Sequence, residues 1–472
     1  MTAPGAGATE ELDREILWLA GDLLTARYAP EGVPIERADC ATGAIVSDRF
    51  ILDELGDFLQ NVAAVTLLLG HPEPLEWAVG LVGRTAGARF RRGGLFEPFA
   101  FHRRRWRRGL GLGLAYPYWN LDTLTGLVAL YEVLQVAGRA GDAGRVRAEI
   151  EGFLQALLAH GTRAGHLRYA FDPRTGCTLP LTSPQLTGYV AEELVRFAHL
   201  AGEHRYLDAA AALLRAECDT PGFRRHGLFC AAVWGPLAPL LRPGLRLLGK
   251  RHFFQPMLTK DNTLPAFALL ALIAARPDET AWAREAVETW RRAVDSGFRT
   301  GAGYFATYAR PDGRVPVRLT FNHSMIEWDI EAHVLTGRSE FLARAQDAAE
   351  RWVALQTARG LFPEGPDGRW RTRSFLDPQV DLSVNLLKLG ELTGDRTCTE
   401  AAVRNFAAIR RDFRLPSGYA WEVDSGTGEV RQPVIEVKYL GLLLKGYLGL
   451  RHVSRGGRLR DAPLMWMLLR DR

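Results

Sequence analysis

Lysine is scarce in this chain of 472 residues, and nearly all of its positive charge is carried by arginine. The lysines are Lys250, Lys260, Lys388, Lys438 and Lys445. The formal net charge is +5, and the one dense basic run, HRRRWRR, has no second basic stripe to accompany it. Because nucleic-acid-binding proteins present extended basic faces, we expect no nucleic-acid partner.

Cysteine is equally scarce, and its spacing excludes two kinds of site. The cysteines are Cys40, Cys177, Cys218, Cys230 and Cys398. They form no CxxC pair and no Cys/His pattern of metal-ligand spacing, so the sequence favours neither a disulfide framework nor a structural zinc centre. We predict a site without metal or cofactor.

Long apolar runs are also lacking. The longest one extends from Leu264 to Ala275, which is too short to cross a bilayer. The first residues include acidic side chains where a signal peptide carries basic ones. With 47% hydrophobic and 24% charged residues, the composition is that of a globular protein with a large core. These features predict a cytoplasmic protein, taken as a single domain over residues 1–472.

A recurring helix boundary is the most informative feature that the chain does have. An apolar helix ends in glycine, and an amphipathic, alanine-rich helix begins a few residues later, as in HVLTGRSEFLARA and GELTGDRTCTEAA. The glycines are Gly70, Gly138, Gly202, Gly337 and Gly394. One further boundary replaces the glycine by Arg276-Pro277. Glycine at such a position caps a helix in the left-handed conformation, as a tight turn between antiparallel helices requires.

The helices on the two sides of this boundary differ in character. Those before it are apolar on most sides, which predicts an inner ring: 116–137, 185–201, 261–275, 323–336, 379–393 and a last one at 434–450. Those after it carry charge on one face, which predicts an outer ring: 206–217, 281–294, 341–355 and 399–411. With residues 10–70 as an opening pair, the fold class is all-α, a toroid of about six to seven helical hairpins. An open solenoid is the alternative, although solenoids keep shorter and more regular periods.

The return connections are long and resemble one another. Each combines aromatic residues, a turn and a polar arm: 166–181, 303–319, 360–375 and 418–434. Asp-Gly and Thr-Gly within alternating residues indicate short β-hairpins. Because the glycine turns occupy one end of the ring, we expect these hairpins at the other end, around the mouths where inner helices begin. Two insert-like loops, 90–115 and 219–259, break the pattern.

The hairpin period, the Leu-Thr-Gly boundary and the aromatic hairpins together resemble the six-hairpin glycosidase-like superfamily. The resemblance covers most of the chain and is architectural, without a diagnostic catalytic motif. It implies an (α/α) toroid that acts on carbohydrate. That group includes glycoside hydrolases, unsaturated-uronyl hydrolases, polysaccharide lyases and sugar epimerases, so the resemblance leaves the reaction open.

Candidate catalytic residues lie near the starts of the inner helices. Asp122, Glu327 and Asp381 lie about one turn inside apolar helices, where a bare carboxylate is costly unless it is paired or functional. His323 and Glu327 are four residues apart on one helical face, which predicts an acid/base pair. Tyr189 is a candidate proton donor for a lyase or epimerase. The structural alternatives are helix capping and an ordinary hydrogen-bonded pair.

Candidate substrate-binding residues share the same mouth. They are Trp119, Asn120, Gln185, Lys260, Asp261, Asn322, Arg318, Trp370, Arg373, Trp421, Glu436 and Lys438. Aromatic faces pack well on sugar rings, and arginines together with helix N-termini favour an anion. We therefore predict an enzyme for a uronate-like sugar or oligosaccharide, either a glycoside hydrolase or a lyase or epimerase.

Two other hypotheses remain open. A non-catalytic toroid that binds a glycan or a protein would use the carboxylates for capping and arginine pairs. A membrane-surface enzyme for a lipid-linked substrate would present the apolar and basic loop at 236–254 to the bilayer.

Overall fold

A computed structural model gives the fold for residues 6–50, 55–87, 90–97, 99–100, 105–106, 114–120, 122–233, 243–244, 247, 258, 260–309 and 316–461. The structure describes only parts of the two predicted insert-like loops, and most of the segment 236–254 and most of the HRRRWRR run lie outside these residues.

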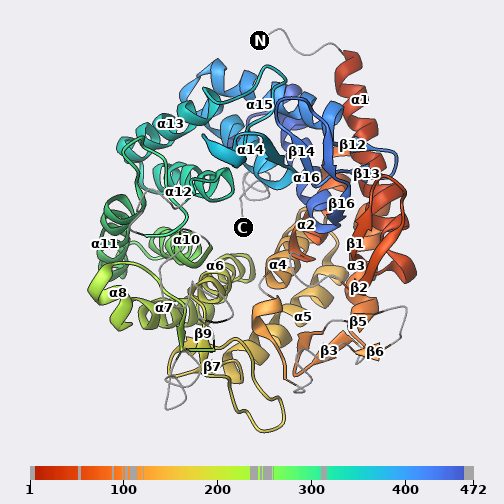
Figure 1. Cartoon of the computed structure of the whole chain (residues 1–472). Helices are drawn as coiled ribbons and strands as arrows, with labels where there is room; N and C mark the ends of the chain where they lie inside the picture. The colour runs from red at the N-terminus through yellow and green to blue at the C-terminus, as the bar shows by residue number, and fades with distance from the viewer. Residues whose placement is uncertain are drawn as a thin grey trace.

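An inner ring of helices surrounds the axis of the molecule (Figure 1). Within the described residues it consists of seven helices: α2 (Leu55–Leu69), α4 (Thr123–Val136), α6 (Pro184–Ala201), α10 (Lys260–Ala275), α12 (Leu319–Thr336), α14 (Leu376–Thr393) and α16 (Lys438–Ser454). Each helix packs on the next, and α16 packs on α2, so the ring is closed. The closed toroid predicted from the sequence is confirmed.

Outer helices cover the ring. They are α3 (Glu73–Thr85), α5 (Ala140–Ala159), α7 (Arg205–Cys218), α11 (Ala281–Phe298), α13 (Ser339–Val353) and α15 (Arg396–Ala408). Each follows and packs on the inner helix before it. The first helix, α1 (Ala6–Leu17), continues into a π-helix, η1 (Trp18–Arg27), and both pack on α16. The prediction that residues 10–70 form one opening pair was therefore wrong, because the beginning of the chain completes the last hairpin.

The glycine boundaries have the predicted left-handed geometry. The φ angles are +77° at Gly70, +67° at Gly138, +70° at Gly202, +71° at Gly337 and +72° at Gly394. A Cβ atom added at any of them would meet nothing within 4 Å. Backbone conformation, and not lack of space, therefore explains glycine at these turns.

Short strands join the two ends of the chain. A five-stranded sheet has the order β16 (Val434–Glu436), β1 (Ile35–Asp39), β2 (Ile45–Phe50), β5 (Phe99–Ala100) and β6 (Arg105–Trp106). β1 pairs antiparallel with β16, and Arg37 lies opposite Glu436. Because these strands precede α2 and α16, the pairing fastens the seam at which the ring closes.

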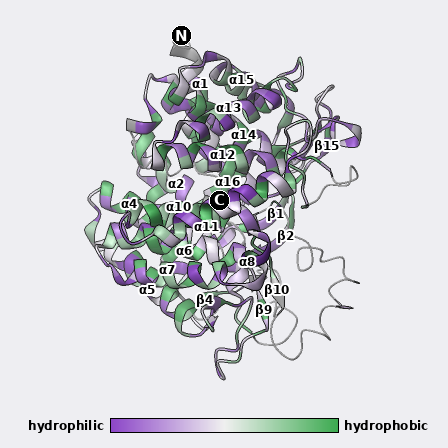
Figure 2. Ribbon diagram, turned by 90° about the vertical axis from the view of Figure 1, so that its left-hand side faces the viewer, coloured by the Kyte–Doolittle hydropathy of each residue, from purple (hydrophilic) through white to green (hydrophobic). Residues whose placement is uncertain are grey.

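The remaining strands form small sheets between helices. A three-stranded sheet contains β11 (Arg373–Phe375), β14 (Glu422–Asp424) and β15 (Val430–Gln432), and β9 (Leu181–Thr182) pairs with β10 (Ala232–Val233). Three further pairs are β3–β4 (Arg91–Arg92, Leu95–Phe96), β7–β8 (Thr162–Arg163, His166–Leu167) and β12–β13 (Arg414–Leu415, Gly418–Tyr419). In Figure 2 the labelled strands β1, β2, β9, β10 and β15 lie on one side of the helical ring, as the hairpin connections predicted.

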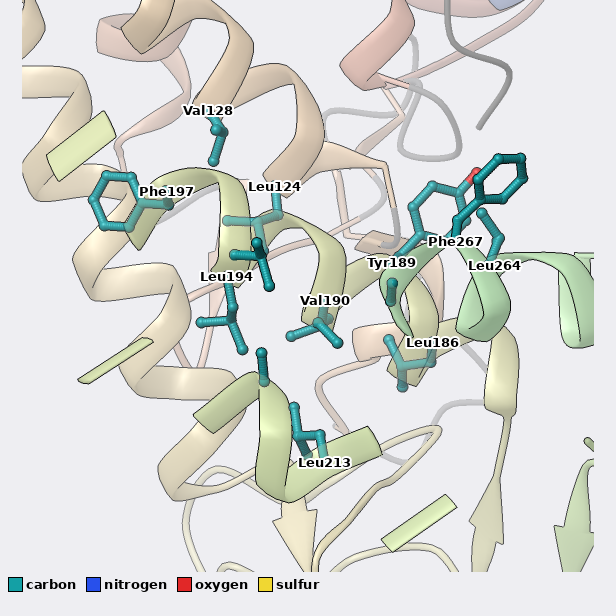
Figure 3. Packing of buried hydrophobic residues seen from close by; sticks show 14 of the residues in the cluster. Leu124, Val128, Leu186, Tyr189, Val190, Leu194, Phe197, Leu213, Leu264 and Phe267 are labelled. Carbon is teal, nitrogen blue, oxygen red and sulfur yellow. The ribbon is translucent and has the colours of Figure 1, made fainter. Parts of the chain in front are cut away.

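The core lies between the two rings of helices. Figure 3 shows one part of it, where Leu124 of α4 and Val190 and Leu194 of α6 pack together above Leu213 of α7. The inner helices are apolar on most sides because they contact both the outer ring and each other. Among the described residues, no helix is long and apolar enough to span a membrane.

Candidate functional site

Amide side chains at the starts of four inner helices hold the hairpins in place. The Nδ2 group of Asn322 donates to the Phe305 carbonyl at 2.9 Å, and its Oδ1 accepts from the Phe305 amide at 2.9 Å. The same two-bond clamp joins Asn120 to Phe96, Asn262 to Phe229 and Gln379 to Phe362. Asn120 and Asn322, predicted to bind substrate, therefore use both ends of their amides on the backbone.

Each clamped phenylalanine follows a glycine with positive φ. These glycines are Gly94 (+84°), Gly227 (+67°), Gly303 (+84°) and Gly360 (+90°). The repeated Gly-Leu-Phe or Gly-Tyr-Phe sequence turns the chain and presents the phenylalanine backbone to the amide. The hairpins are thus fixed to the helix mouths by the same device in both halves of the ring.

A histidine, an aspartate and a lysine from three consecutive inner helices meet near the mouth. The Nε2 atom of His323 in α12 lies 4.0 Å from Oδ2 of Asp381 in α14. The other carboxylate oxygen, Oδ1, accepts from Nζ of Lys445 in α16 at 3.2 Å. His323 is 4% exposed and Asp381 is 5% exposed. An imidazole and a carboxylate that accepts from a lysine therefore lie close together at the edge of the ring interior.

A second ionic group lies deeper along the same helices. Lys388 of α14 donates from Nζ to Oε1 of Glu327 at 2.9 Å and to Oε1 of Glu331 at 3.3 Å. Lys388 and Glu327 are both completely buried. Asp381 is therefore a carboxylate beside the imidazole, and Glu327, the predicted partner of His323, accepts from a buried lysine.

Arginines converge on the ring of Trp370 at the rim. The guanidinium carbons of Arg318, Arg369 and Arg373 lie 4.5, 4.7 and 5.2 Å from the ring centroid. Trp370 itself is half-buried in a 3-10 turn, η7 (Gly368–Trp370). Cation–π attraction operates within about 6 Å, so the three arginines hold the indole in place.

Two buried glutamates neutralise two of these arginines. Glu364, which is completely buried, accepts from Nε of Arg318 at 2.7 Å and from Oγ1 of Thr320 at 2.5 Å. Burial raises the pKa of the Glu364 carboxyl, and Arg318 opposes this shift. Glu422 accepts both bonds of a bidentate pair from Arg373, at 2.7 and 2.6 Å. The charge expected to bind an acidic sugar is therefore largely matched within the protein.

An aromatic stack stands beside this rim. Trp421 stacks on Tyr439 with ring centroids 4.3 Å apart. The Nζ atom of Lys438 lies 4.9 Å from the Tyr439 ring and 3.2 Å from Oε2 of Glu436. The Glu436 side chain is 45% exposed, whereas that of Lys438 is 10% exposed. These four residues join the end of the five-stranded sheet to the start of α16.

The opposite side of the mouth is built from hydroxyls and aromatic rings. Oγ of Ser183 donates to Oδ1 of Asp261 at 3.1 Å, and Asp261 is 9% exposed. Tyr169 stacks on Tyr118 at 4.3 Å, and burial raises its pKa well above the usual tyrosine range. Trp119 stacks on the neighbouring Tyr116 ring at 4.1 Å.

Asp122 lies in a tight helix crossing. It is 1% exposed and precedes α4 at the N-cap position, but its side chain makes no capping bond. A Cβ atom on Gly56 would lie 2.8 Å from the Asp122 carboxylate, and one on Gly126 would lie 2.5 Å from the Gly56 Cα. Asp122 is therefore enclosed where α2 and α4 touch.

Tyr189 belongs to the hydrophobic core. It is 2% exposed, and Figure 3 shows its ring beside Leu264 and Phe267 of α10. Gln185, one turn earlier in α6, is half-buried at the mouth. The side chain of Lys260 lies outside the part of the molecule that the structure describes.

The sequence did not indicate the ion pairs between inner helices and at the rim. Lys388, Lys445, Glu364 and Glu422 were not among the predicted site residues. A signal existed, because two of the five lysines fall in the middle of apolar inner helices. Among the described residues, no three His, Cys, Asp or Glu side chains are arranged to hold a metal ion.

Comparison with known proteins places the fold. No protein-family model matches the chain, and no curated protein sequence does. An alpha-1,2-mannosidase from Trichoderma reesei has a similar structure, with a TM-score of 0.68 and 12% identity over 94% of this chain and 93% of that one. A D-mannose isomerase gives 0.55 at 12% identity over 94% and 97% of the two chains. A cellobiose 2-epimerase from Bacillus thermoamylovorans gives 0.54 at 11% identity over 94% and 100%. The chain therefore has the same (α/α) toroid fold as these solved structures, which confirms the fold class that the sequence predicted.

Proposed function

We propose that this protein is an enzyme that transforms a sugar by proton transfer at the mouth of the inner ring. The observation that carries the proposal is the meeting of His323, Asp381 and Lys445 on three adjacent helices. The names of the structural neighbours, which describe a mannosidase, an isomerase and an epimerase, support carbohydrate as the substrate class.

The arrangement suits an acid/base role for His323. An adjacent carboxylate stabilises the imidazolium that forms when the ring accepts a proton. The Lys445 ammonium in turn stabilises the charge of Asp381 and fixes its orientation. His323 would exchange the proton, Asp381 would orient the ring, and Lys445 would position Asp381. Isomerisation and epimerisation of a sugar both require a group that removes a proton from carbon and returns it, and His323 would be that group.

Aromatic residues at the rim would hold the sugar. Trp370 and Trp421 offer large faces of the kind that pack on sugar rings. Of the other predicted contacts, Arg318, Arg373, Asp261, Trp119, Gln185, Lys260, Glu436 and Lys438 remain candidates for substrate binding. Asn120 and Asn322 are better explained by the hairpin clamps.

An acidic group on the sugar remains part of the proposal. Its support is Arg369, which lies on the Trp370 ring and forms no ion pair with any described residue. Arg318 and Arg373 contribute less, because Glu364 and Glu422 match their charges. The alternative is a neutral sugar, and the panel of neutral and acidic sugars described below distinguishes the two.

Hydrolysis is a second candidate, favoured by Glu364. Burial raises the pKa of this carboxyl, which is the direction that a general acid for glycoside cleavage needs; in that role Glu364 would be protonated and would no longer balance the charge of Arg318. Hydrolysis would also need a second carboxylate across the bond that is cleaved.

The test is a proton-exchange assay on a panel of neutral and acidic sugars in D2O. Nuclear magnetic resonance would report both deuterium incorporation at carbon and the release of new reducing ends. We expect incorporation with at least one sugar, its loss in His323→Gln, and its retention in His333→Gln. His333 is the matched control because it lies at the other end of α12, where its Nδ1 faces the Arg338 carbonyl.

The outcomes separate the alternatives. Hydrolysis products without incorporation would replace the leading proposal by the second one. Binding of a sugar, seen as a raised unfolding midpoint, with neither reaction would favour a non-catalytic toroid. Incorporation that survives in His323→Gln would reject the role of this histidine.

A further inference from the structure

A basic pocket lies on the outer ring, between the first helix and the end of α15. Its volume is about 630 Å³. One wall comes from α1 and the start of η1, including Arg14 and Trp18. The other comes from Arg410 and Arg411 of a second π-helix, η8 (Ile409–Phe413), and from Arg414. These residues are separate from the inner-ring mouth.

Positive charge exceeds negative charge in this pocket. Four arginines and two glutamates line it. Arg410 forms an ion pair with Glu11, and Nε of Arg414 donates to Oε1 of Glu15 at 3.1 Å. Arg14 is exposed and forms no ion pair with any residue that the structure describes. Arg411 pairs with Asp412, which lies outside the lining, so the lining itself keeps a formal excess of two positive charges and Arg14 is its one arginine without an ion pair to a described residue.

Both walls contain an unusual backbone conformation. η1 and η8 are the two π-helical segments of the described residues, and each contributes to the lining. π-helical turns are rare and occur frequently at functional sites. Two of them facing one pocket are a second observation, independent of the charge, that points to a ligand.

The floor of the pocket is rigid. Glu15 is 7% exposed and accepts from the Tyr419 hydroxyl at 2.7 Å. The Tyr419 hydroxyl lies 3.0 Å from that of Tyr447 in α16. The guanidinium of Arg414 lies 4.5 Å from the Trp18 ring centroid. Glu15 and Trp18 hold Arg414 in position before any ligand arrives, which reduces the cost of ordering this arginine on binding.

We propose that this pocket binds a phosphate group, either as inorganic phosphate or as the phosphoryl group of a small metabolite. A phosphate monoester carries nearly two negative charges at neutral pH, which matches the excess of the lining. Planar guanidinium groups from two walls can each donate paired hydrogen bonds to a tetrahedral oxyanion. The proposal does not depend on the sugar reaction at the inner-ring mouth.

The experiment measures phosphate binding by calorimetry and by the shift of the unfolding midpoint. The probes are inorganic phosphate and glucose 6-phosphate, each compared with sodium chloride at equal ionic strength. The variants are Arg14→Gln, which alters an exposed side chain without an ion pair, and the double variant Arg14→Gln with Arg411→Gln. Arg292→Gln is the matched control, because Arg292 is exposed on α11 and likewise forms no ion pair with a described residue.

We expect both phosphates to raise the midpoint of the wild type more than chloride does. Each lost charge-assisted contact should weaken binding by about tenfold. Arg292→Gln should bind as the wild type does. Tighter binding of glucose 6-phosphate would identify a sugar phosphate as the ligand, and equal binding would identify phosphate itself. Equal shifts by phosphate and chloride, or unchanged binding in Arg14→Gln, would overturn the proposal.

Discussion

The two halves of the inner ring stabilise their buried carboxylates in different ways. In the half formed by α12, α14 and α16, a lysine of the following inner helix pairs with two buried carboxylates, Lys388 with Glu327 and Lys445 with Asp381. In the half formed by α4, α6 and α10, hydroxyls donate to the buried carboxylates, and the cation nearest to Glu193 is Arg196 of its own helix, at 3.9 Å. Thr125 donates to Glu193 at 3.1 Å and Ser183 donates to Asp261.

Both buried lysine–carboxylate pairs thus lie in the C-terminal half of the ring. A buried ion pair costs desolvation of both charges, so it gives little net stability even though breaking it is strongly destabilising. The chain nevertheless uses two of its five lysines in this way, side by side in the C-terminal half. We infer that this half carries the reaction and that the other half shapes and supports the mouth.

The largest expected effect comes from breaking the deeper ion pair. Lys388→Met leaves Glu327 and Glu331 as buried charges without their cation, and should lower the free energy of unfolding by about 3–5 kcal/mol. Thr125→Val removes a neutral donor in the other half and should cost about 1 kcal/mol. Urea unfolding monitored by circular dichroism measures both.

A compensating variant provides the control for this prediction. Adding Glu327→Gln and Glu331→Gln to Lys388→Met removes the stranded charges and should recover most of the lost stability. Equal losses for Lys388→Met and Thr125→Val would contradict the contrast between the two halves.

The architecture could be predicted from the sequence because its signals are local. A glycine after an apolar helix needs no distant partner to be recognised, and the five glycine turns were confirmed. The seam was not predicted, because β1 and β16 lie at opposite ends of the chain and three-residue pairings leave no periodic pattern. The clamps were missed because the number of residues between the amide and its phenylalanine varies from clamp to clamp. Asn262 is farther along the sequence from Phe229 than Asn322 is from Phe305.

The clamps should matter equally in both halves. Asn322→Leu and Asn262→Leu each leave a backbone N–H and a carbonyl of the clamped phenylalanine without their partner, which should cost about 2–3 kcal/mol. Chemical denaturation of the two variants tests the prediction. A loss in one half alone would show that the clamps are not equivalent.

A pH effect is expected where the C-terminal half meets the outer ring. Burial raises the pKa of Asp329 in α12 to about 7, although Arg344 of α13 donates to its carboxylate. The folded protein then binds a proton that the unfolded chain releases near pH 4, so this stabilisation is present at low pH and is lost as the pH rises through 7. Between pH 6 and 8 the loss should be about 1.4 kcal/mol.

The variant Asp329→Asn checks the source of this slope. It removes the titrating group, so its stability should change less over the same range than that of the wild type. Stability curves at pH 6, 7 and 8 provide the measurement, and parallel curves for the two proteins would rule out Asp329 as the cause.

The smallest effect is expected at the glycine turns. Gly202→Ala and Gly394→Ala each force alanine to a φ angle near +70°, which should cost about 1 kcal/mol. Because a Cβ atom meets nothing at either position, the two costs should be alike. Thermal unfolding of both variants measures them, and a large difference would show that packing also contributes.

The site was harder to predict than the fold because its partners come from different helices. Helical spacing put Glu327 on the face of His323, but Asp381, which lies beside the imidazole, comes from the neighbouring helix α14. A single sequence does not show which side chains of two packed helices face each other. The surroundings of Tyr189, predicted as a proton donor, were not predictable for a related reason, since its ring lies beside Leu264 and Phe267 of another helix, α10 (Figure 3).

The most direct test of the central claim is a crystal structure of the protein with the sugar that exchanges deuterium. The sugar should lie on the C-terminal half of the mouth, with the reacting atom within hydrogen-bonding distance of the His323 imidazole and a ring face against Trp370 or Trp421. A sugar bound against Asp261 and Tyr169 in the other half, out of reach of His323, would contradict it.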